Sequence, residues 1–330
     1  MPEPLDADPR DATARDAEPI ELPRRVRIRE VGPRDGFQNE PEVIPTAEKV
    51  RLIGLLLDAG ISRIELTSLV RPDVIPQLAD AAEVLGAIDP RPGVDRSVLI
   101  PNERGLERAL EWRDRIDEIS VFLSASESHN RRNVNRSIEE SLAGLGRVLE
   151  RAGESGLRRV GVIATSFGCP YEGEVPPERV FGIAERLLKA GCEEIGFGDT
   201  TGMANPRQVR AFFRAASDRL AAGRAGAPEL TAHFHNTRGQ GLANVLAALE
   251  AGIESFESSF GELGGCPVPA GATGNIATED LVSMLHEMGI ETGIDLPRLL
   301  AASSAVREVL DRPLGAHVLT AGPVDWDPAG

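Results

Sequence analysis

The sequence predicts a single (β/α)8 barrel, or TIM barrel, with extra helices at its C-terminal end. Eight short extended segments alternate with longer segments whose apolar residues recur at helical spacing. Strands that alternate with helices form parallel sheets, and eight such units close into a barrel. No Gly-x-Gly-x-x-Gly motif follows the first strand, which disfavours the main alternative, an open doubly wound sheet.

Each predicted strand is a short apolar run bordered by turn-forming residues. The eight strands cover residues 26–30, 63–67, 97–100, 118–123, 159–165, 194–199, 230–235 and 255–260. The helices that follow the first seven strands cover residues 46–59, 74–88, 103–114, 137–155, 177–191, 205–222 and 239–252. Gly60 and Gly191 close the first and fifth of these helices, a position that favours glycine.

Three regions follow from the composition along the chain. Residues 1–24 are rich in Pro, Asp and Glu and are predicted to form a disordered acidic leader. Residues 25–312 contain no Pro- or Ser-rich linker and are predicted to be one catalytic domain, with two helices after about residue 279. Residues 313–330 are predicted to be a tail.

The net charge limits the possible binding partners, and the cysteines indicate the cellular location. A formal net charge of −16 disfavours nucleic acid and anionic membranes as partners. No apolar stretch approaches the roughly 18 residues of a transmembrane helix. Cys169, Cys192 and Cys266 are scattered and odd in number, which indicates free thiols in a reducing cytoplasm. The sequence leaves a homo-oligomer open.

Active sites of such barrels lie at the C-terminal ends of the strands, and polar residues gather there. Arg34 and Asp35 follow the first strand, although Arg-Asp-Gly alone is more often a surface turn. His233 and His235 end the seventh strand, and residues two apart on a strand face the same side. Two satisfied structural histidines are the alternative interpretation. Carboxylate with imidazole suits a divalent cation such as Mg²⁺, Mn²⁺ or Zn²⁺.

Further candidates lie at the same end of the predicted barrel. Glu65 is on the second strand, and Asp199 ends the sixth. The glycine-rich loop after the eighth strand contains Cys266 and leads to Asn275, whose amide oxygen could join the metal ligands. Glycine-rich loops over a barrel mouth often act as lids. Alone, each residue is weak evidence, and their shared position is what favours an active site.

These motifs, in this order, resemble the hydroxymethylglutaryl-CoA lyase family, one branch of a group of metal-dependent barrel enzymes that includes the isopropylmalate synthases. The resemblance extends over roughly residues 26–290. The matching stretches are Val31–Glu40, Ser126-Glu127, Asn133–Asn135, Gly168–Gly173, Gly198–Thr200, His233–His235, Gly264–Pro267 and Gly274-Asn275. Gly-Gly-Cys-Pro at 264–267 is the lyase-specific motif.

The resemblance implies a reaction and a set of ligands. In that family the corresponding residues bind Mg²⁺ or Mn²⁺, which implies Asp35, His233, His235 and Asn275 as ligands here. The implied activity is that of an oxo-acid lyase, a retro-Claisen cleavage of 3-hydroxy-3-methylglutaryl-CoA to acetyl-CoA and acetoacetate.

The resemblance also implies roles for the remaining residues. His233 is the expected base for the substrate hydroxyl, and Arg34 is expected to stabilise the thioester enolate. Cys266 is expected to protonate the enolate carbon, while Glu65 and Asp199 are expected to orient Arg34, water or substrate. The CoA phosphates are anionic, and a basic cluster after the fourth strand, Arg131, Arg132 and Arg136, could bind them.

Departures from the family pattern leave the acyl group open. They are Arg71, Asp73, Asn236, Arg238 and Glu262. The alternatives are a lyase for a related branched 3-hydroxyacyl-CoA, a condensing acyl-CoA synthase and a barrel that binds a metabolite without catalysis. A synthase is expected to carry a C-terminal regulatory domain. A barrel that has lost catalysis is not expected to retain the metal ligands together with Arg34 and Cys266.

Overall fold

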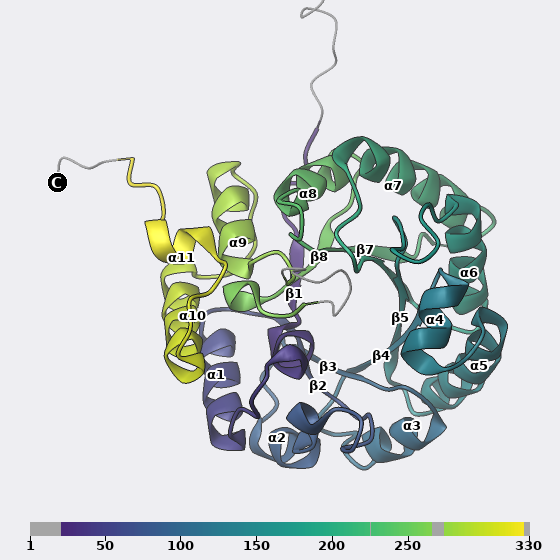
Figure 1. The fold of residues 1–330 in the computed structure, drawn as a ribbon, viewed down its shortest axis with the longest axis horizontal. Helices are drawn as coiled ribbons and strands as arrows, with labels where there is room; N and C mark the ends of the chain where they lie inside the picture. The colour runs from purple at the N-terminus through teal and green to yellow at the C-terminus, as the bar shows by residue number, and fades with distance from the viewer. Residues whose placement is uncertain (1–20, 225, 266–273, 327–330) are drawn as a thin grey trace, which may run out of the picture.

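The computed structural model of the protein describes residues 21–224, 226–265 and 274–326. Eight parallel strands form a closed barrel in which each strand pairs with the next and β8 pairs with β1 (Figure 1). The predicted barrel is therefore confirmed. The strands are β1 (Arg27–Glu30), β2 (Arg63–Ser68), β3 (Asp95–Leu99), β4 (Glu118–Ser124), β5 (Arg158–Ala164), β6 (Glu194–Asp199), β7 (Glu229–Phe234) and β8 (Ser255–Ser258).

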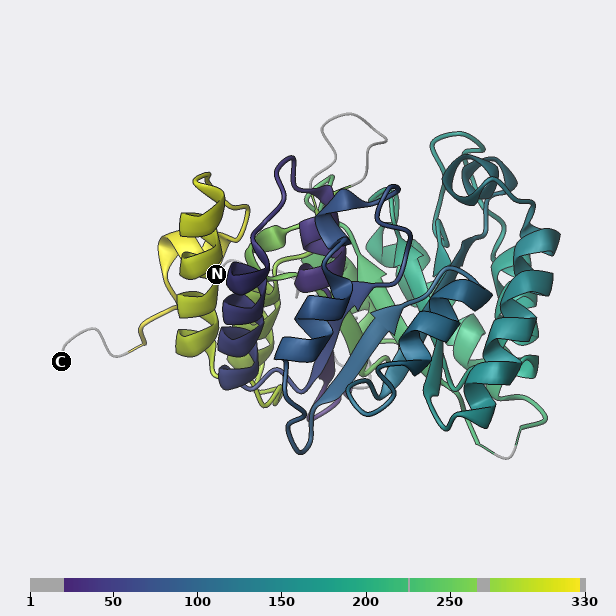
Figure 2. The ribbon, with the colours of Figure 1, turned by 90° about the horizontal axis from the view of Figure 1, so that it is seen from below.

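Helices surround the barrel, and three C-terminal helices extend it beside α1 (Figures 1 and 2). The helices are α1 (Thr46–Asp58), α2 (Ala81–Ala87), α3 (Glu103–Leu110), α4 (Glu127–Val134), α5 (Ile138–Glu154), α6 (Pro177–Lys189), α7 (Pro206–Ala221), α8 (Gly241–Leu249), α9 (Thr278–Glu287), α10 (Leu296–Leu310) and α11 (His317–Ala321). The two helices predicted after residue 279 correspond to α9 and α10. None of the described helices is long and apolar enough to cross a membrane.

Local sequence explains where these helices begin and end. Ser137 caps α5 with its side chain, which accepts a hydrogen bond from the N–H of Glu140, while the carboxylate of Glu140 accepts one from the N–H of Ser137. Gly60 and Gly191 follow α1 and α6 with φ of 94° and 104°, a conformation that glycine adopts without strain. These contacts satisfy backbone groups that the helix ends would otherwise leave unpaired.

Two helix predictions need correction. The segment 74–88 was predicted to be one helix, but α2 begins only at Ala81. A 3-10 turn, Pro76–Leu78, precedes it, and Ile75 has a non-helical backbone (φ −130°, ψ 85°) because a proline disfavours helical conformation in the residue before it. The short helix α4 was not predicted: of its eight residues only Asn130 is buried, so it has no apolar stripe to indicate it.

Ion pairs, rather than apolar side chains alone, fill the end of the barrel opposite the predicted active site. Arg29 and Arg63 lie inside, each only 2% exposed. Arg29 Nη2 donates to Glu194 Oε2 at 3.0 Å, and Arg63 Nη2 donates to the same oxygen at 2.6 Å. Arg63 Nη2 also donates to Glu118 Oε2 at 3.0 Å. Although burial alone would raise the pKa of Glu194, the two guanidinium groups hold it well below its usual range. We call Arg29, Arg63, Glu118, Glu194 and the residues paired with them the basal ion-pair network. The network extends to Glu257, which accepts a hydrogen bond from Arg29 Nη1 at 2.8 Å.

Candidate active site

Arg34 and Asp35 lie in a tight turn directly after β1. Residues Gly32–Gly36 form one π-helical turn, a conformation that is rare and frequent at functional sites. Arg34 Nη1 donates to Asp35 Oδ1 at 2.7 Å, and Arg34 Nε donates to Glu65 Oε2. Burial alone would lower the pKa of Arg34, but Glu65 and Asp35 raise it above its usual range. The guanidinium is thus permanently charged and fixed between two carboxylates.

The two predicted histidines face each other at the end of β7. Their Nε2 atoms are 3.1 Å apart, and both side chains are buried. His233 Nδ1 lies 2.9 Å from Glu257 Oε2 on β8, so this nitrogen carries a proton when it bonds the carboxylate. Burial, followed by the charge of His233, lowers the pKa of His235 to about 3. Nε2 of His233 is therefore the nitrogen left to accept a cation or a proton.

Asn275 reaches the site because its segment adds to the end of the barrel. An isolated β-bridge pairs His235 with Asn275, and the N–H of Ile276 donates to the carbonyl of Phe234. Asn275 Nδ2 donates to Asp35 Oδ2 at 2.8 Å. Its amide oxygen is buried and has no hydrogen-bond partner among the described residues. A buried acceptor of this kind needs a partner that protein atoms do not provide.

Glycines permit this close approach at the base of the loop after β8. A Cβ on Gly264, whose φ is 109°, would lie 2.7 Å from Asn275 Nδ2. A Cβ on Gly274 would lie 2.5 Å from the carbonyl oxygens of Glu262 and Gly264. Side chains at either position would push Asn275 away from Asp35.

The arrangement suits a divalent cation. Ligand atoms of Asp35, His233 and His235 all lie within 4.8 Å of one another. Burial would raise the pKa of Asp35, but Arg34 and the two histidines lower it, so the carboxylate is ionised. Asn275, which bonds Asp35 through Nδ2, has a buried amide oxygen without a partner among the described residues and could supply a fourth donor. Carboxylate, imidazole and amide oxygen together are a typical donor set for Mg²⁺ or Mn²⁺.

A cavity of about 670 Å³ opens above these residues. Arg34, Asp35, His233 and His235 are part of its wall. The wall also contains apolar side chains, which include Val70, Val74, Ile75, Leu99, Phe122, Leu145 and Val162. Charged and apolar side chains in one cavity suit a ligand with a charged head and an acyl chain.

The other sequence candidates occupy different places. Glu65 lies below Arg34 and accepts a hydrogen bond from Ser120 Oγ. Asp199 Oδ1 accepts from the N–H groups of Met203 and Ala204, at 2.8 and 3.1 Å, which holds the turn after β6. Burial raises the pKa of Asp199 to about 7. Neither Glu65 nor Asp199 is among the described residues that line the cavity. Cys266 lies outside the described residues.

Glu257 is a site residue that the sequence interpretation missed. It contacts His233 on one side and Arg29 on the other, and it is buried. Burial would raise its pKa, but His233 and Arg29 lower it to about 2, so the group is a carboxylate. The available signal was a charged residue within the short apolar strand 255–260. Strands of a parallel barrel are covered on both faces, so a charge there must have a partner.

Comparisons with known proteins agree with this geometry. The HMGL-like family model matches residues 25–306 of this chain. A hydroxymethylglutaryl-CoA lyase of Bacillus subtilis is 47% identical over 297 residues, which cover 90% of this chain and 97% of that protein. A 3-hydroxy-3-isohexenylglutaryl-CoA/hydroxymethylglutaryl-CoA lyase of Pseudomonas aeruginosa is 42% identical over 302 residues, covering 92% of this chain and 98% of that protein.

A solved structure shares the same fold. It is an HMG-CoA lyase of Acinetobacter baumannii in complex with coenzyme A and 3-methylmalate. It superimposes with a TM-score of 0.84 and 41% sequence identity, over 91% of this chain and 95% of that one. The similarity thus covers the barrel and the helices around it.

Proposed function

The chain belongs to the HMGL-like family, and we propose that it cleaves 3-hydroxy-3-methylglutaryl-CoA to acetyl-CoA and acetoacetate. The protein is accordingly a carbon–carbon lyase. The observation that carries the proposal is the meeting of Asp35, His233 and His235 around one point beside Arg34, in a barrel that matches lyases over nine-tenths of its length.

The proposed cofactor is Mg²⁺ or Mn²⁺, held by Asp35, His233, His235 and Asn275. The support is the proximity of the first three and the unpartnered buried oxygen of the fourth. When bound, the cation would act as a Lewis acid toward the carboxylate and hydroxyl oxygens of the substrate.

The side chains of the protein account for the remaining steps. His233 Nε2 accepts the proton of the 3-hydroxyl group, and the bond between C2 and C3 then breaks to leave a ketone at C3. The bonding electrons pass to the thioester, whose enolate oxygen pairs with the guanidinium of Arg34. Cys266 donates the proton that converts the enolate carbon to the methyl group of acetyl-CoA. One nitrogen cannot bind a cation and accept a proton at once, so the two roles of His233 exclude each other at any instant.

The first test is release of acetyl-CoA from 3-hydroxy-3-methylglutaryl-CoA. We expect rapid release with Mg²⁺ or Mn²⁺ and none in EDTA, with recovery when the metal is returned. Rates that are equal with and without chelator would contradict the metal assignment. No release from a metal-loaded protein would contradict the substrate.

The Asp35→Ala variant tests the proposed metal ligands. We expect Mn²⁺ affinity to fall by more than about 100-fold, because even groups that only orient a ligand typically account for 10- to 100-fold. Titration calorimetry with MnCl₂ measures the loss, and circular dichroism with urea unfolding shows whether the barrel remains intact. Unchanged Mn²⁺ affinity in a folded variant would remove Asp35 from the site.

A larger branched substrate is the second candidate. The wall of the cavity of about 670 Å³ contains several apolar side chains, and the P. aeruginosa relative is named for both an isohexenylglutaryl and a methylglutaryl thioester. The comparison that decides is kcat/KM for the two thioesters. A value at least tenfold higher for the isohexenyl compound would make it the preferred substrate.

A cytoplasmic location and a homo-oligomeric state are two further proposals. The buried free thiols of Cys169 and Cys192 support a reducing, cytoplasmic location. A homo-oligomer is testable by light scattering on the purified chain.

A further inference from the structure

Two side chains that depart from the family pattern contact each other beside the proposed metal site. Asn236 directly follows the proposed ligand His235, and Glu262 lies in the segment after β8. Asn236 Nδ2 donates to Glu262 Oε1 at 2.8 Å. Neither Asn236 nor Glu262 is among the described residues that line the cavity of about 670 Å³, so any effect on the reaction must pass through other residues.

The backbone of Glu262 is held in an unfavourable conformation. Its φ is 61°, in the left-handed region that residues other than glycine rarely adopt. Such a conformation persists where the surrounding contacts determine it, and it is concentrated at functional sites. The Glu262 carboxylate is confined on two sides: Asn236 bonds Oε1, and a Cβ added to Gly315 would lie 1.5 Å from Oε2 and 2.6 Å from Cδ. Only a glycine between α10 and α11 leaves room for this carboxylate.

The bond between Asn236 and Glu262 belongs to a closed ring of contacts around Asn275. The backbone N–H of Asn236 donates to the carbonyl of Gly274, directly before Asn275, at 3.1 Å. Asn275 Nδ2 donates to the carbonyl of Leu263, directly after Glu262, at 3.1 Å. Asn236 therefore holds both segments that place Asn275, one through its backbone and the other through its side chain.

This ring determines which end of the Asn275 amide is free. An amide nitrogen carries two donors, and here one bonds the carbonyl of Leu263 and the other bonds Asp35 Oδ2 at 2.8 Å. The amide oxygen is left without a partner among the described residues. If the carbonyl of Leu263 shifted, the amide would lose one of the two bonds that fix its rotation. The oxygen would then no longer be directed to one place.

We propose that Glu262 is a positioning residue for the metal site: bonded to Asn236, it fixes the carbonyl of Leu263 and thereby directs the amide oxygen of Asn275 toward the cation. This inference rests on the proposed function for the identity of the ligands. Its own basis is the confined carboxylate of Glu262, its left-handed backbone and the closed ring of hydrogen bonds.

The experiment compares Glu262→Ala with Glu262→Gln, two variants that remove the same charge. Glutamine retains an oxygen that can accept from Asn236, whereas alanine does not. We expect the Mn²⁺ affinity to fall roughly 10- to 100-fold in Glu262→Ala, the usual effect of losing a group that orients a ligand, and less than about threefold in Glu262→Gln. Titration calorimetry with MnCl₂ measures both. Equal Mn²⁺ affinity in Glu262→Ala and the parent would overturn the proposal.

Two further variants change the contact in other ways. Gly315→Ala displaces the carboxylate without removing it and should weaken Mn²⁺ binding as Glu262→Ala does. The double variant Asn236→Asp/Glu262→Gln exchanges the donor and the acceptor at unchanged net charge and should bind Mn²⁺ as the parent does. A double variant that binds as weakly as Glu262→Ala would contradict the role of this hydrogen bond.

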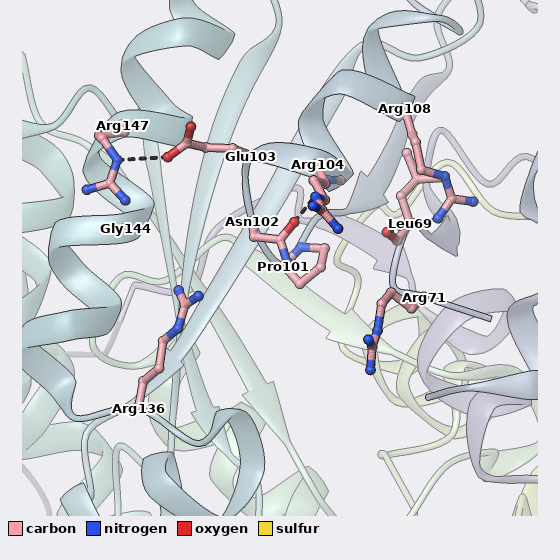
Figure 3. Close-up of a pocket in the computed structure, with 11 residues that line it drawn as sticks. Leu69, Arg71, Pro101, Asn102, Glu103, Arg104, Arg108, Arg136, Gly144 and Arg147 are labelled. Atoms are coloured by element: carbon pink, nitrogen blue, oxygen red, sulfur yellow. Dashed lines mark hydrogen bonds and ion pairs between the residues drawn. The ribbon is translucent and has the colours of Figure 1, made fainter. Parts of the chain in front are cut away.

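A matched control removes a carboxylate from a similar contact elsewhere. Glu103 on α3 accepts from Arg147 Nε of α5 at 2.7 Å, a pair that Figure 3 shows. Glu103→Ala should leave the Mn²⁺ affinity unchanged. A similar loss of affinity in Glu103→Ala and Glu262→Ala would show that the effect comes from charge and not from position.

Glu262→Gly separates positioning from a purely structural role. Glycine adopts a φ of 61° without strain, so the Tm of Glu262→Gly should equal or exceed that of Glu262→Ala. The bond to Asn236 is absent from both variants, so the Mn²⁺ affinity should be low in both. An affinity that recovers together with the Tm would mean that Glu262 acts only on stability and would overturn the proposal.

Hydrogen exchange of the metal-free protein separates this inference from the proposed function. In EDTA, the N–H groups of Asn236 and Ile276, which bond the carbonyls of Gly274 and Phe234, should exchange faster in Glu262→Ala than in the parent, whatever the protein cleaves. Mass spectrometry of the peptides measures this. Unchanged exchange would overturn the inference, whereas an unchanged Mn²⁺ affinity in Asn275→Ala would instead remove Asn275 from the proposed ligands and with it the role of Glu262.

Discussion

Glu257 fixes the orientation and the tautomer of the His233 ring. Because the carboxylate holds Nδ1 and its proton, Nε2 points toward Asp35 and His235. A carboxylate in this position fixes the tautomer and increases the basicity of the ring. Glu257 thus belongs to the site although it sits between the histidine and the basal ion-pair network.

We expect Glu257→Gln to weaken Mn²⁺ binding by roughly 10- to 100-fold, the usual effect of removing such a carboxylate. Calorimetric titration with MnCl₂ measures it. Glu229→Gln is the matched control, since Glu229 belongs to the network through Arg63 and does not contact His233. A similar loss in both variants would attribute the effect to the barrel rather than to the ring.

The Cys266→Ala variant tests the proposed proton donor. If Cys266 protonates the enolate carbon, the substitution lowers kcat by roughly 100-fold or more, the usual contribution of a general acid, and leaves KM almost unchanged. Steady-state kinetics with 3-hydroxy-3-methylglutaryl-CoA give both constants. A loss that appears in KM alone would assign the thiol to binding.

Among the elements, β1 and β2 are linked to other strands through the buried ion pairs of Arg29 and Arg63. Both guanidinium groups are buried among carboxylates from β4, β6 and β8. Removing one member of a buried ion pair leaves the remaining charges uncompensated, which commonly costs about 3–5 kcal/mol. The network therefore ties non-adjacent strands together through charge.

We expect Arg29→Met to lower the free energy of unfolding by about 3–5 kcal/mol. Urea unfolding followed by circular dichroism measures the change. Arg91→Met, which breaks an exposed pair with Asp58, should change stability by less than about 1 kcal/mol. A loss no larger than that of this control would mean that the network contributes little.

Most elements could be predicted from the sequence because their apolar residues repeat with the right period. The helix α4 could not, since it is polar and begins only because Ser126 caps it. The proximity of Asp35, His233 and His235 could be predicted because parallel strands end at one edge, and the structure does bring the three together. Glu257 was not found, because its role depends on contacts with residues 24 and 228 positions away, which no local pattern records.

At the scale of the whole molecule, two buried carboxyls on the side of the C-terminal helices contribute, together with Asp199, to the dependence of stability on pH near neutrality. Burial raises the pKa of Glu30 to about 8 and that of Glu279 to about 7. An unfolded glutamate titrates near about 4.3. Between these values the folded state binds protons that the unfolded state has released, so stability falls as the pH rises.

We expect the free energy of unfolding to decrease from pH 5 to pH 8 by up to about 1.4 kcal/mol per pH unit for each group. Glu30→Gln and Glu279→Gln should each remove part of this slope. The difference between variant and parent isolates the carboxyl, because other groups with shifted pKa values, such as Asp199, are the same in both proteins. Parallel curves for parent and variants would show that these carboxyls do not titrate there.

The basal ion-pair network joins strands from both halves of the chain, which matters if the chain is cut in two. A break between β4 and β5 would leave Arg29, Arg63 and Glu118 on the first piece, and Arg158, Glu194, Glu229 and Glu257 on the second. The first piece would then expose surplus positive charge on its inner face and the second surplus negative charge. Neither half could bury that face alone, yet each carries what the other lacks. Two separately synthesised halves should therefore recognise each other and assemble into a barrel with its strands in the correct order.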